Sequence, residues 1–480
     1  MVSGVLLLPA TLLLVLFSLI LTTTTAMSSA AAAKQLASTV TSPSRVRVAI
    51  IGGGVAGCAS ARRLAQLAPL VEITLYEIGR GPGGRASTRK TRAHPHLYIN
   101  HGAPYADIRS GLGRSIVSSL GPSSVAPFLG ARGSLNSNTG EFLRDNNTEA
   151  DGDDGPQYIT GANGEMSEIA ASLIRGIPSI ETKYKTMVRA LSRAAQTTGT
   201  EWELKDKDEQ VIGTADWLVV AGSGIAHPRW SNTFGGQPPL IAAEQEHRDP
   251  KLRTALDAIA GQQVSPVLAV FFSCSGPVAR KWLLLDYNVA NVEGSSVLSK
   301  VVIQGGTKNK ATDADADGED DEWCSVVLHS TEEFALQNSG VYGSSSSAAR
   351  VGDASSDASR EDSLIEKMVV ALNEIPGVPE IHIESDESKE TSSSQQQSTS
   401  RSKYDYGPVL HRWGNAFPKG KALQEDLSFL PSSRVAFCGD YVASSEQARF
   451  GSFESALLSG RFAGEKIAKE CLKQATTILQ

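Results

Sequence analysis

The first clear pattern of apolar residues lies at 46–65, where a short run is followed by a glycine-rich turn and a longer, helix-like segment. Residues 46–51 (VRVAII) have the length of a strand and are rich in β-branched side chains, which favours a place inside a parallel sheet. A second run of this kind, residues 71–76 (VEITLY), ends at Glu77. A strand, a helix and a second strand in this order predict a βαβ unit and an α/β fold.

The turn after the first strand carries three glycines in the spacing G-x-G-x-x-G. The first permits a tight turn, the second lets the backbone approach a pyrophosphate, and the third lets helix and strand pack closely. The helix N-terminus that follows offers unpaired N–H groups and a partial positive charge, which suit a diphosphate. The predicted phosphate-binding residues are Gly52, Gly54, Val55, Ala56 and Gly57.

An acid and, directly after it, a basic glycine loop follow the glycine turn. Glu77 lies 20 residues after Gly57, where an acid can bind the hydroxyls of an adenosine ribose and would repel a 2′-phosphate. Residues 80–90 (RGPGGRASTRK) can double back over the phosphates, and Arg85 can contribute a charged fork to them. Arg80 and Gly84 of this loop are also predicted to bind the cofactor. A basic glycine loop directly after the ribose acid favours FAD over NAD.

Residues 434–464, close to the C-terminus, form a second candidate cofactor segment. They are expected to form a strand that ends at Gly439-Asp440 and then a helix of small residues. This segment could close over the far side of a dinucleotide held on the first glycine turn. We expect noncovalent FAD, because none of the five cysteines lies in the setting that covalent attachment uses. The cysteine spacing also indicates neither a metal site nor a disulfide framework.

Between these two segments, further elements are predicted from alternating or continuous apolar runs. A hairpin is expected at 201–204 and 210–212, and DWLVV at 216–220 should return to the central sheet. Other predicted strands lie at 185–188, 264–272, 300–304 and 325–329, and a helix with one apolar face lies at 362–375.

These elements predict a discontinuous Rossmann-type FAD-binding domain with an inserted, mixed and mainly antiparallel β-sheet substrate domain. The FAD-binding domain is expected at 45–105, 157–224 and 404–469, and the substrate domain at 106–156 and 225–403. Acidic or Ser-rich stretches with few apolar residues are expected to be disordered insertions, at 311–321, 339–360 and 384–403.

Several strings in the chain resemble the renalase-like branch of the flavin amine oxidase superfamily. They are GPGGRASTR, INHGAPY at 99–105, YITGANGEMSEIAASL at 158–173, EWCSVVLHSTEEFA at 322–335, HRWGNAFP at 411–418, and Gly439-Asp440. The resemblance spans about residues 45–469, with gaps at the low-complexity stretches. One departure is Glu454-Ser455-Ala456, where the family usually has Glu-Gly-Ala. The resemblance also implies that the backbone of Val188 meets the adenine.

The resemblance implies a flavoenzyme that oxidises a small reduced substrate, such as a dihydronicotinamide (NAD(P)H) or an amine, by hydride transfer to flavin N5. Oxygen or another acceptor would then take the electrons. The catalytic residues remain unassigned, because the chain shows no Ser/His/Asp constellation and no convincing catalytic lysine. His101 and Trp413 are the candidates for residues next to the flavin. His101 is explained equally well as a structural histidine, and Trp413 is expected to form an apolar wall against the flavin. Two alternatives stay open: a plastid polyene desaturase or isomerase, and a non-catalytic flavin-binding protein.

Composition and the N-terminal residues bear on the binding partners and the cellular location of the protein. A net charge of −7 makes a nucleic-acid surface unexpected, and the 41% hydrophobic content suits packed domains. Residues 5–21 are almost wholly apolar, and a Ser/Ala/Thr-rich stretch without acids follows to residue 44. This layout predicts a cleaved targeting segment at 1–44 that leads through the secretory route to a plastid, leaving a soluble protein. Secretion, residence in the endoplasmic reticulum, or anchoring by residues 5–21 are the alternatives.

Overall fold

The structure is a computed structural model that describes residues 45–145, 155–193, 201–307, 322–354, 356–382, 404–443 and 448–478. The described residues from Val46 onward belong to one compact unit, to which the following description applies. The predicted targeting segment at 1–44 and the predicted insertions at 311–321 and 384–403 lie outside the described residues. Among the residues described, no helix has the length and apolar character needed to span a bilayer.

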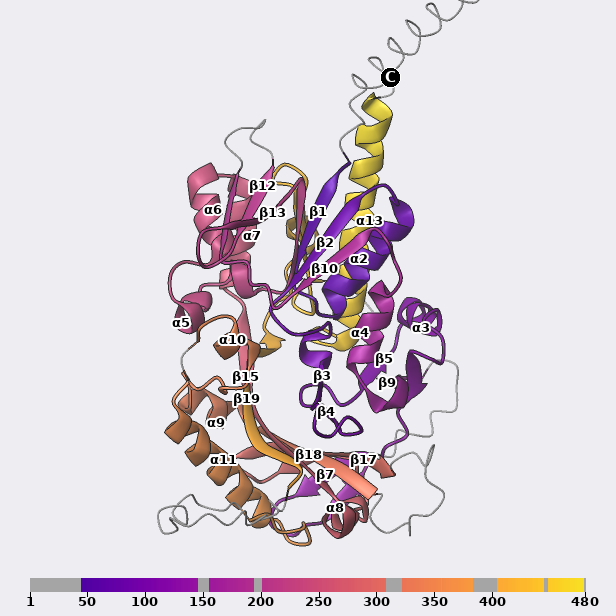
Figure 1. The fold of residues 1–480 in the computed structure, drawn as a ribbon, viewed down its shortest axis with the longest axis vertical. Helices are drawn as coiled ribbons and strands as arrows, with labels where there is room; N and C mark the ends of the chain where they lie inside the picture. The colour runs from indigo at the N-terminus through magenta and orange to yellow at the C-terminus, as the bar shows by residue number, and fades with distance from the viewer. Residues whose placement is uncertain are drawn as a thin grey trace, which may run out of the picture. The chain divides into compact units, whose positions relative to one another are not determined.

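The larger of the two parallel-strand regions is a six-stranded sheet, which contains β1, β2 and β10 in the upper part of Figure 1. Its order is β10 (Ile180–Tyr184), β2 (Glu72–Glu77), β1 (Arg47–Ile51), β14 (Trp217–Ala221), β21 (Val435–Cys438) and β20 (Phe429–Leu430). The first five strands run parallel, and β20 is antiparallel to β21. The central strands are apolar on both sides, as a parallel sheet covered on both faces requires.

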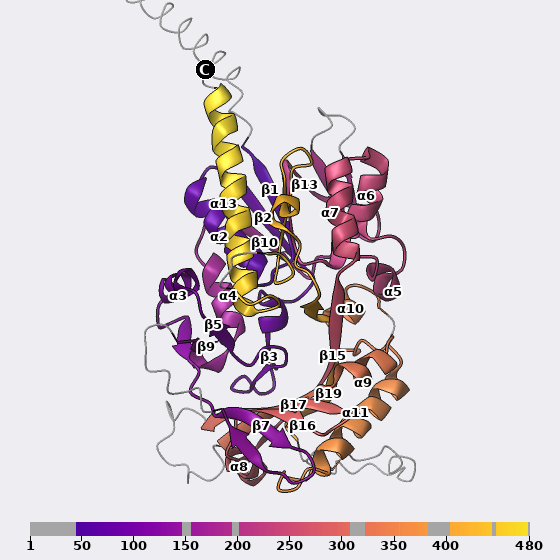
Figure 2. The same ribbon diagram turned by 180° about the vertical axis from the view of Figure 1, so that it is seen from behind.

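Helices cover both faces of this sheet. On one face, α2 (Val55–Leu67), α4 (Ser167–Ile174) and α13 (Phe453–Ile478) share a core with the strands, and α13 lies along α2 (Figure 2). A Cβ atom on Gly460 of α13 would lie 2.1 Å from the Ala56 carbonyl oxygen, so the small residues of α13 permit this close approach. On the other face, α5 (Trp230–Phe234), α6 (Pro239–His247) and α7 (Pro250–Ala260) share a second core.

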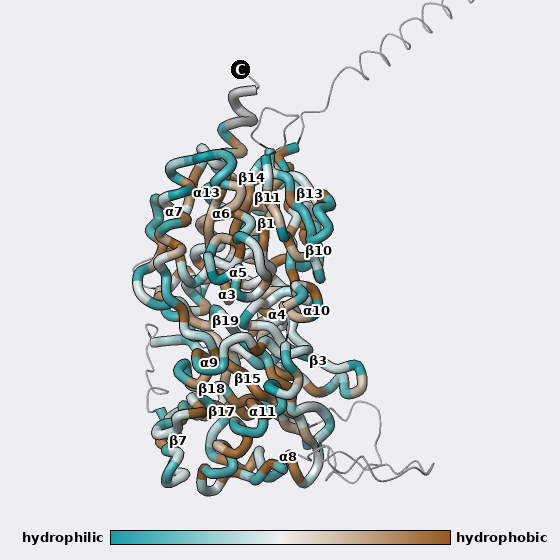
Figure 3. The backbone as a smooth tube through the Cα atoms, turned by 90° about the vertical axis from the view of Figure 1, so that its left-hand side faces the viewer, coloured by the Kyte–Doolittle hydropathy of each residue, from teal (hydrophilic) through white to brown (hydrophobic). Residues whose placement is uncertain are grey.

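A separate seven-stranded sheet is antiparallel except for the β7–β16 pair. Its order is β19 (Tyr406–Lys419), β15 (Gln263–Ser275), β18 (Glu322–Ser330), β17 (Leu298–Thr307), β16 (Val289–Glu293), β7 (Arg132–Asn136) and β8 (Phe142–Arg144). Even-numbered residues of β15 such as Phe272 pack with α8 (Gly276–Leu283), α9 (Glu332–Gln337) and α11 (Ala358–Asn373). Phe271 faces the opposite side, toward Ile99 and Trp413. Hydrophobic segments run along β15 and β17 (Figure 3).

Three small sheets and several short helices complete the described part of the chain. The sheets are β3 (Thr88–Lys90) with β4 (Tyr98–Asn100); β5 (Ala106–Ile108), β9 (Gln157–Gly161) and β6 (Val125–Pro127); and β11 (Ala190–Arg193), β12 (Trp202–Lys205) and β13 (Val211–Ala215). The short helices include η1 (Gly84–Ala86), α3 (Gly111–Ser118), η3 (Ala162–Gly164), η4 (Gly224–Ala226), α10 (Ser347–Arg350) and α12 (Glu425–Ser428). The Rossmann-type α/β sheet with an inserted, mainly antiparallel sheet is the predicted fold class.

The predicted strand at 185–188 is wrong in position. The strand after α4 is β10, which ends at Tyr184, and Lys185 then adopts a left-handed backbone conformation with φ 55°. The Lys185 and Thr186 N–H groups donate to the carbonyl oxygens of Gly79 and Glu77. The chain therefore turns across the end of β2 here, and Val188 is buried in a loop that follows the turn.

Three predicted segments also differ from the observed packing. The segment 404–419 was expected with the cofactor domain, but β19 pairs along most of its length with β15 in the other sheet. The helices α5 to α7 were expected with the substrate domain, but they cover the six-stranded sheet. Residues 339–360 were expected to be disordered, but Val341 is fully buried and the segment contains α10 and the start of α11. Val341 belongs to the apolar core shared by the seven-stranded sheet and its helices, which places this segment against that sheet.

Candidate functional site

The glycine turn joins β1 tightly to α2. Gly52 has φ +112°, a conformation that favours glycine, and its N–H donates to the Tyr76 carbonyl oxygen at 2.8 Å. A Cβ atom on Gly57 would lie 2.0 Å from the Gly52 carbonyl oxygen, so only glycine permits this contact between turn and helix. Val55 and Ala56 begin α2 and are buried.

The N-terminus of α2 is open to a ligand. Its N-cap residue is Gly54, no side chain of the described residues caps it, and its first turn contains no acid. A Cβ atom on Gly54 would meet only the Gly84 Cα atom, 4.0 Å away. Gly84 belongs to the 80–90 loop, and the neighbouring Gly83 N–H donates to the Gly53 carbonyl oxygen at 2.8 Å. Free space and unpaired helix N–H groups beneath a glycine loop fit a diphosphate.

Glu77 holds two backbone loops together. Its Oε2 accepts from the Gly53 N–H and its Oε1 from the Gly79 N–H, both at 2.6 Å. Burial raises the pKa of the Glu77 carboxyl, and these two hydrogen bonds oppose the rise. A carboxylate has lone pairs left for ribose hydroxyls, so the predicted ribose contact fits. Glu77 also supports the turn, a role that its position in the sequence did not reveal.

Arg85 and Asp440 form a bidentate ion pair between the two ends of the chain. The two terminal nitrogens of Arg85 donate to the two carboxylate oxygens of Asp440, each at 2.6 Å, and Arg85 also donates to the Ala416 carbonyl oxygen at 2.5 Å. Desolvation opposes the charge of Arg85, but Asp440 outweighs it and raises the pKa of the guanidinium. The guanidinium of Arg85 was expected to bind the phosphates, but Asp440 occupies it. The Arg85 side chain is still 38% exposed. Arg80 is exposed.

The C-terminal segment is tied to the helix that follows it. Gly439 has φ +145°, and its N–H donates to the Ser459 Oγ at 2.9 Å. Ser455 donates from its Oγ to the Ser452 carbonyl oxygen at 3.0 Å. Glu454 is only 1% exposed and accepts from the backbone N–H groups of Arg109 and Ser110, so it anchors the start of α3.

His101 lies at a junction between the cofactor loops and the seven-stranded sheet. Its carbonyl oxygen accepts from the Trp413 Nε1 and contacts the His329 Nε2, both at 3.1 Å. A Cβ atom on the next residue, Gly102, would lie 2.1 Å from the Arg85 carbonyl oxygen and 3.2 Å from the Trp413 ring. The two flavin-adjacent candidates, His101 and Trp413, are therefore in direct contact.

Around the same point, aromatic rings gather beside a buried cation. The His101 ring centre lies 4.9 Å from that of His411, 5.1 Å from that of Trp413 and 5.2 Å from that of Phe271. Arg89 lies over the Phe271 ring at 5.1 Å and donates to the Tyr406 hydroxyl at 2.8 Å.

The histidines of this junction are neutral at neutral pH. Burial, with smaller effects from neighbouring positive charge, lowers the pKa of His411 to about 3, that of His329 to about 4, and that of His101 well below its ordinary value. Among the described residues, the Nδ1 atoms of His101 and His411 are buried and have no hydrogen-bond partner. Sequence reasoning assigned no role to His329, His411 or Arg89, although all three lie inside strings that carry the family resemblance.

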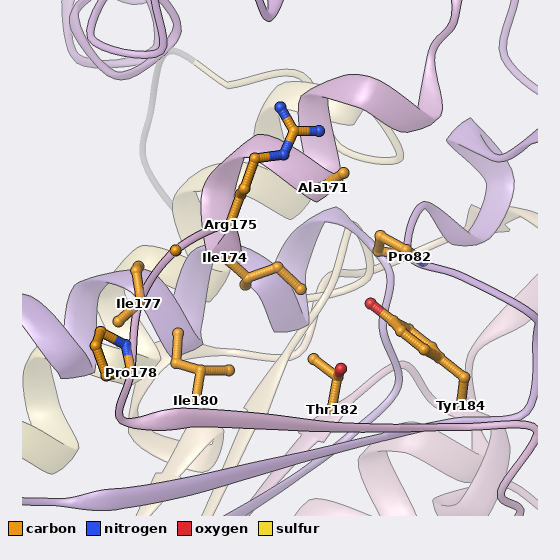
Figure 4. A pocket seen from close by; sticks show the side chains of 10 residues that line it. Pro82, Ala171, Ile174, Arg175, Ile177, Pro178, Ile180, Thr182 and Tyr184 are labelled. Carbon is orange, nitrogen blue, oxygen red and sulfur yellow. The ribbon is translucent and has the colours of Figure 1, made fainter.

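Two cavities lie near these elements. One, of about 160 Å³, borders the 100–104 segment, and no charged side chain is found among its described lining residues, which include Tyr98, Asn100, Phe128 and Gln304. The other is a groove of about 490 Å³ at the edge strand β10, lined by Pro82, Arg175 and Tyr184 among others (Figure 4). Of the predicted 80–90 loop this groove contains only Pro82, and His101 is not among the lining residues of either cavity.

Comparisons with known proteins give one family match and distant structural similarities. Residues 50–109, which contain the glycine turn, Glu77, Arg85 and His101, match the family model of a NAD(P)-binding Rossmann-like domain. A search of curated proteins finds no match to the chain. A structure named "Putative protoporphyrinogen oxidase" from Exiguobacterium sp. 255-15 is similar, with 11% identity and a TM-score of 0.53, over 89% of this chain and 99% of that chain. A cyclohexylamine oxidase from Brevibacterium oxydans IH-35A is also similar, with 14% identity and a TM-score of 0.49, over 89% and 99% of the two chains.

Proposed function

We propose that this protein is a renalase-like, FAD-dependent oxidoreductase that oxidises a small reduced substrate, a dihydronicotinamide or an amine. The observation that carries the proposal is the convergence of the glycine turn, the 80–90 loop and Gly439-Asp440, joined by the Arg85–Asp440 ion pair. The chemistry that noncovalently bound FAD supplies is acceptance of a hydride at N5, with the electrons passed on to oxygen or another acceptor.

Residues of this chain would hold FAD at three points. The Gly52–Gly57 turn and the N-terminus of α2 would bind the pyrophosphate, because that helix end is open and uncapped by the described side chains. Glu77 would bind the adenosine ribose with its remaining lone pairs. Gly439-Asp440 and the Arg85 donors that Asp440 leaves free would close the site from the other side.

The junction around His101 supports a neutral donor more than a protonated amine. Its histidines are uncharged, and the nearby Arg89 is a buried cation that would repel an ammonium group. The 160 Å³ cavity beside Asn100 is close to the size that holds one six-membered ring, about 150 Å³ in an engineered example. Holding such a ring in contact with its acceptor is the main demand of hydride transfer.

Anaerobic mixing tests the reaction directly. A reduced pyridine nucleotide should bleach the visible flavin absorbance of the purified protein, and a primary amine should bleach it more slowly or not at all. Bleaching by a polyene alone would replace the proposal with the desaturase alternative. Flavin that is bound but bleached by none of these donors would favour the non-catalytic alternative.

A matched pair of variants tests the FAD site. Gly54→Asp places a carboxylate at the α2 N-terminus, where the added Cβ meets nothing closer than 4.0 Å, so the fold should tolerate it and the diphosphate should not. Gly111→Asp places the same carboxylate at the start of α3, where a Cβ meets nothing within 4 Å. The first variant should purify colourless and the second yellow. Release of the flavin from the parent protein on denaturation checks that it is noncovalent.

We further propose that residues 1–44 direct the protein to a plastid through the secretory route and are then removed. The apolar run at 5–21 and the acid-free stretch behind it support this proposal. Mass-spectrometric mapping of the N-terminus, combined with cell fractionation, tests it. A mature N-terminus near residue 45 in plastids is expected. An intact apolar run in a membrane fraction would favour the anchor, and recovery from the medium would favour secretion.

A further inference from the structure

Cys274 and Cys324 lie directly opposite each other in the seven-stranded sheet. Cys274 on β15 is paired in register with Cys324 on the antiparallel strand β18. Their Sγ atoms are 3.3 Å apart, and the two residues are 1% and 0% exposed. The other three cysteines, at 58, 438 and 471, are also buried free thiols.

The backbone geometry of this pair suits a covalent bond. Residues directly opposite each other in antiparallel strands have Cα atoms about 4.5–5.5 Å apart. A disulfide needs Cα atoms about 4.4–6.8 Å apart and a sulfur–sulfur bond of about 2.05 Å. The two sulfur atoms therefore have to approach by only about 1.3 Å, which side-chain rotation can supply without moving the strands.

We propose that Cys274 and Cys324 form a cross-strand disulfide when the chain folds in an oxidising compartment with a small-molecule disulfide, such as oxidised glutathione, as the oxidant. One cysteine thiolate attacks the oxidant and forms a mixed disulfide, releasing one reduced glutathione. The second cysteine thiolate then displaces the other glutathione. The two cysteine thiols lose two electrons and two protons in total, and one oxidised glutathione becomes two reduced molecules.

Because both cysteines are buried in the folded protein, the disulfide should form during folding. The thiolate is the reactive form, and hydrogen bonding to Cys274 together with burial raises the pKa of the Cys324 thiol in the folded protein. An oxidant also has no direct route to side chains that are at most 1% exposed. The bond should therefore form before the sheet closes, and it should resist reductants afterwards.

The crosslink would stabilise strands that also build the proposed site. β18 carries His329, which contacts the His101 carbonyl oxygen, and β15 carries Phe271, whose ring lies beside His101. The two cysteines close a loop of about 50 residues that includes β16 and β17, so the disulfide would constrain the unfolded chain. The inference does not depend on flavin binding.

Peptide mapping of the full chain tests the proposal. The chain is refolded with a mixture of oxidised and reduced glutathione, then denatured in excess iodoacetamide and digested with trypsin. Peptides 254–280 and 311–350, which contain the two cysteines, should be found joined, and a reductant should separate them. The linked chain should melt roughly 3–8 °C higher than the reduced chain.

Two variants provide controls. Cys274→Ser should abolish the linked peptide, whereas Cys471→Ser, which alters another buried cysteine, should retain it. The map of the parent chain is decisive by itself if Cys274→Ser fails to fold. Alkylation of all five thiols after oxidative refolding, or a crosslink that joins other cysteines, would overturn the proposal.

Discussion

Arg85 and Asp440, 355 residues apart in the chain, are joined by two parallel hydrogen bonds of 2.6 Å between guanidinium and carboxylate. The pair connects the loop that covers the α2 N-terminus with the end of β21. It therefore brings the N-terminal and C-terminal cofactor motifs to one place. Asp440 is nearly buried, its side chain 6% exposed, whereas Arg85 retains contact with solvent.

Replacing Asp440 by Asn should lower both stability and flavin retention. The change leaves the Arg85 charge without its partner, and we expect a loss of about 1–3 kcal/mol, less than for a fully buried pair because Arg85 is partly exposed. Urea unfolding and the flavin content of the purified protein measure the two effects. Glu425→Gln, in the exposed pair with Lys466, should cost at most about 0.5 kcal/mol. Equal losses in the two variants would contradict the prediction.

Replacing Glu77 by Gln should destabilise the fold as well as weaken FAD binding. The amide offers one acceptor oxygen where the carboxylate serves both Gly53 and Gly79, so one backbone N–H loses its partner. We expect a loss of about 1–3 kcal/mol in the free energy of unfolding, measured in the flavin-free protein. Glu181→Gln, an exposed acid on the neighbouring strand β10, is the control and should leave stability unchanged.

The ring and the indole N–H of Trp413 should contribute separately to the rate of flavin reduction. Trp413→Phe keeps an aromatic ring but removes the hydrogen bond to the His101 carbonyl oxygen, so we expect a several-fold loss of flavin reduction rate. Trp413→Ala removes the ring as well and should cost roughly ten-fold more, with weaker flavin binding. Stopped-flow reduction at several donor concentrations separates rate from affinity. A rate that is the same in both variants would show that the ring is not part of the site.

Acid should destabilise the protein through its buried histidines. The pKa of His329 is about 4 in the folded state and about 6.5 when unfolded, so the unfolded chain binds more protons between these values. The stability from this neutral His329 is fully present above pH 6.5 and is lost as the pH falls toward 4, by roughly 3 kcal/mol.

Urea unfolding at several pH values measures this effect. His329→Gln should flatten the pH dependence in this window, since the titrating group is removed. His382→Gln, which changes a histidine that is 58% exposed, should leave the profile as it is in the parent protein. A parent protein whose stability is constant from pH 7 to pH 4.5 would refute the assignment.

Local patterns in the sequence were enough to predict the framework. The alternation of apolar runs with glycine turns identified β1, α2, β2, β15, β18 and α11, because each pattern reflects contacts within one segment or its immediate neighbours. The spacing of Gly52, Gly54 and Gly57 predicted the tight turn and the close helix packing for the same reason. Where local signals were weak, as at 185–188 and 339–360, the predictions were wrong.

Only the tertiary structure decided which distant side chains meet. The partners of Arg85, Glu77 and His101 are set by strand register and loop closure over long separations, which no local pattern records. The same holds for Cys274 and Cys324, whose scattered positions in the sequence gave no sign of a pair until β15 and β18 were in register. A shift of one residue in that register would turn the side chains of one strand to the opposite face. The sequence alone thus determined the fold class and the cofactor motifs, and the packing of the two sheets determined the site.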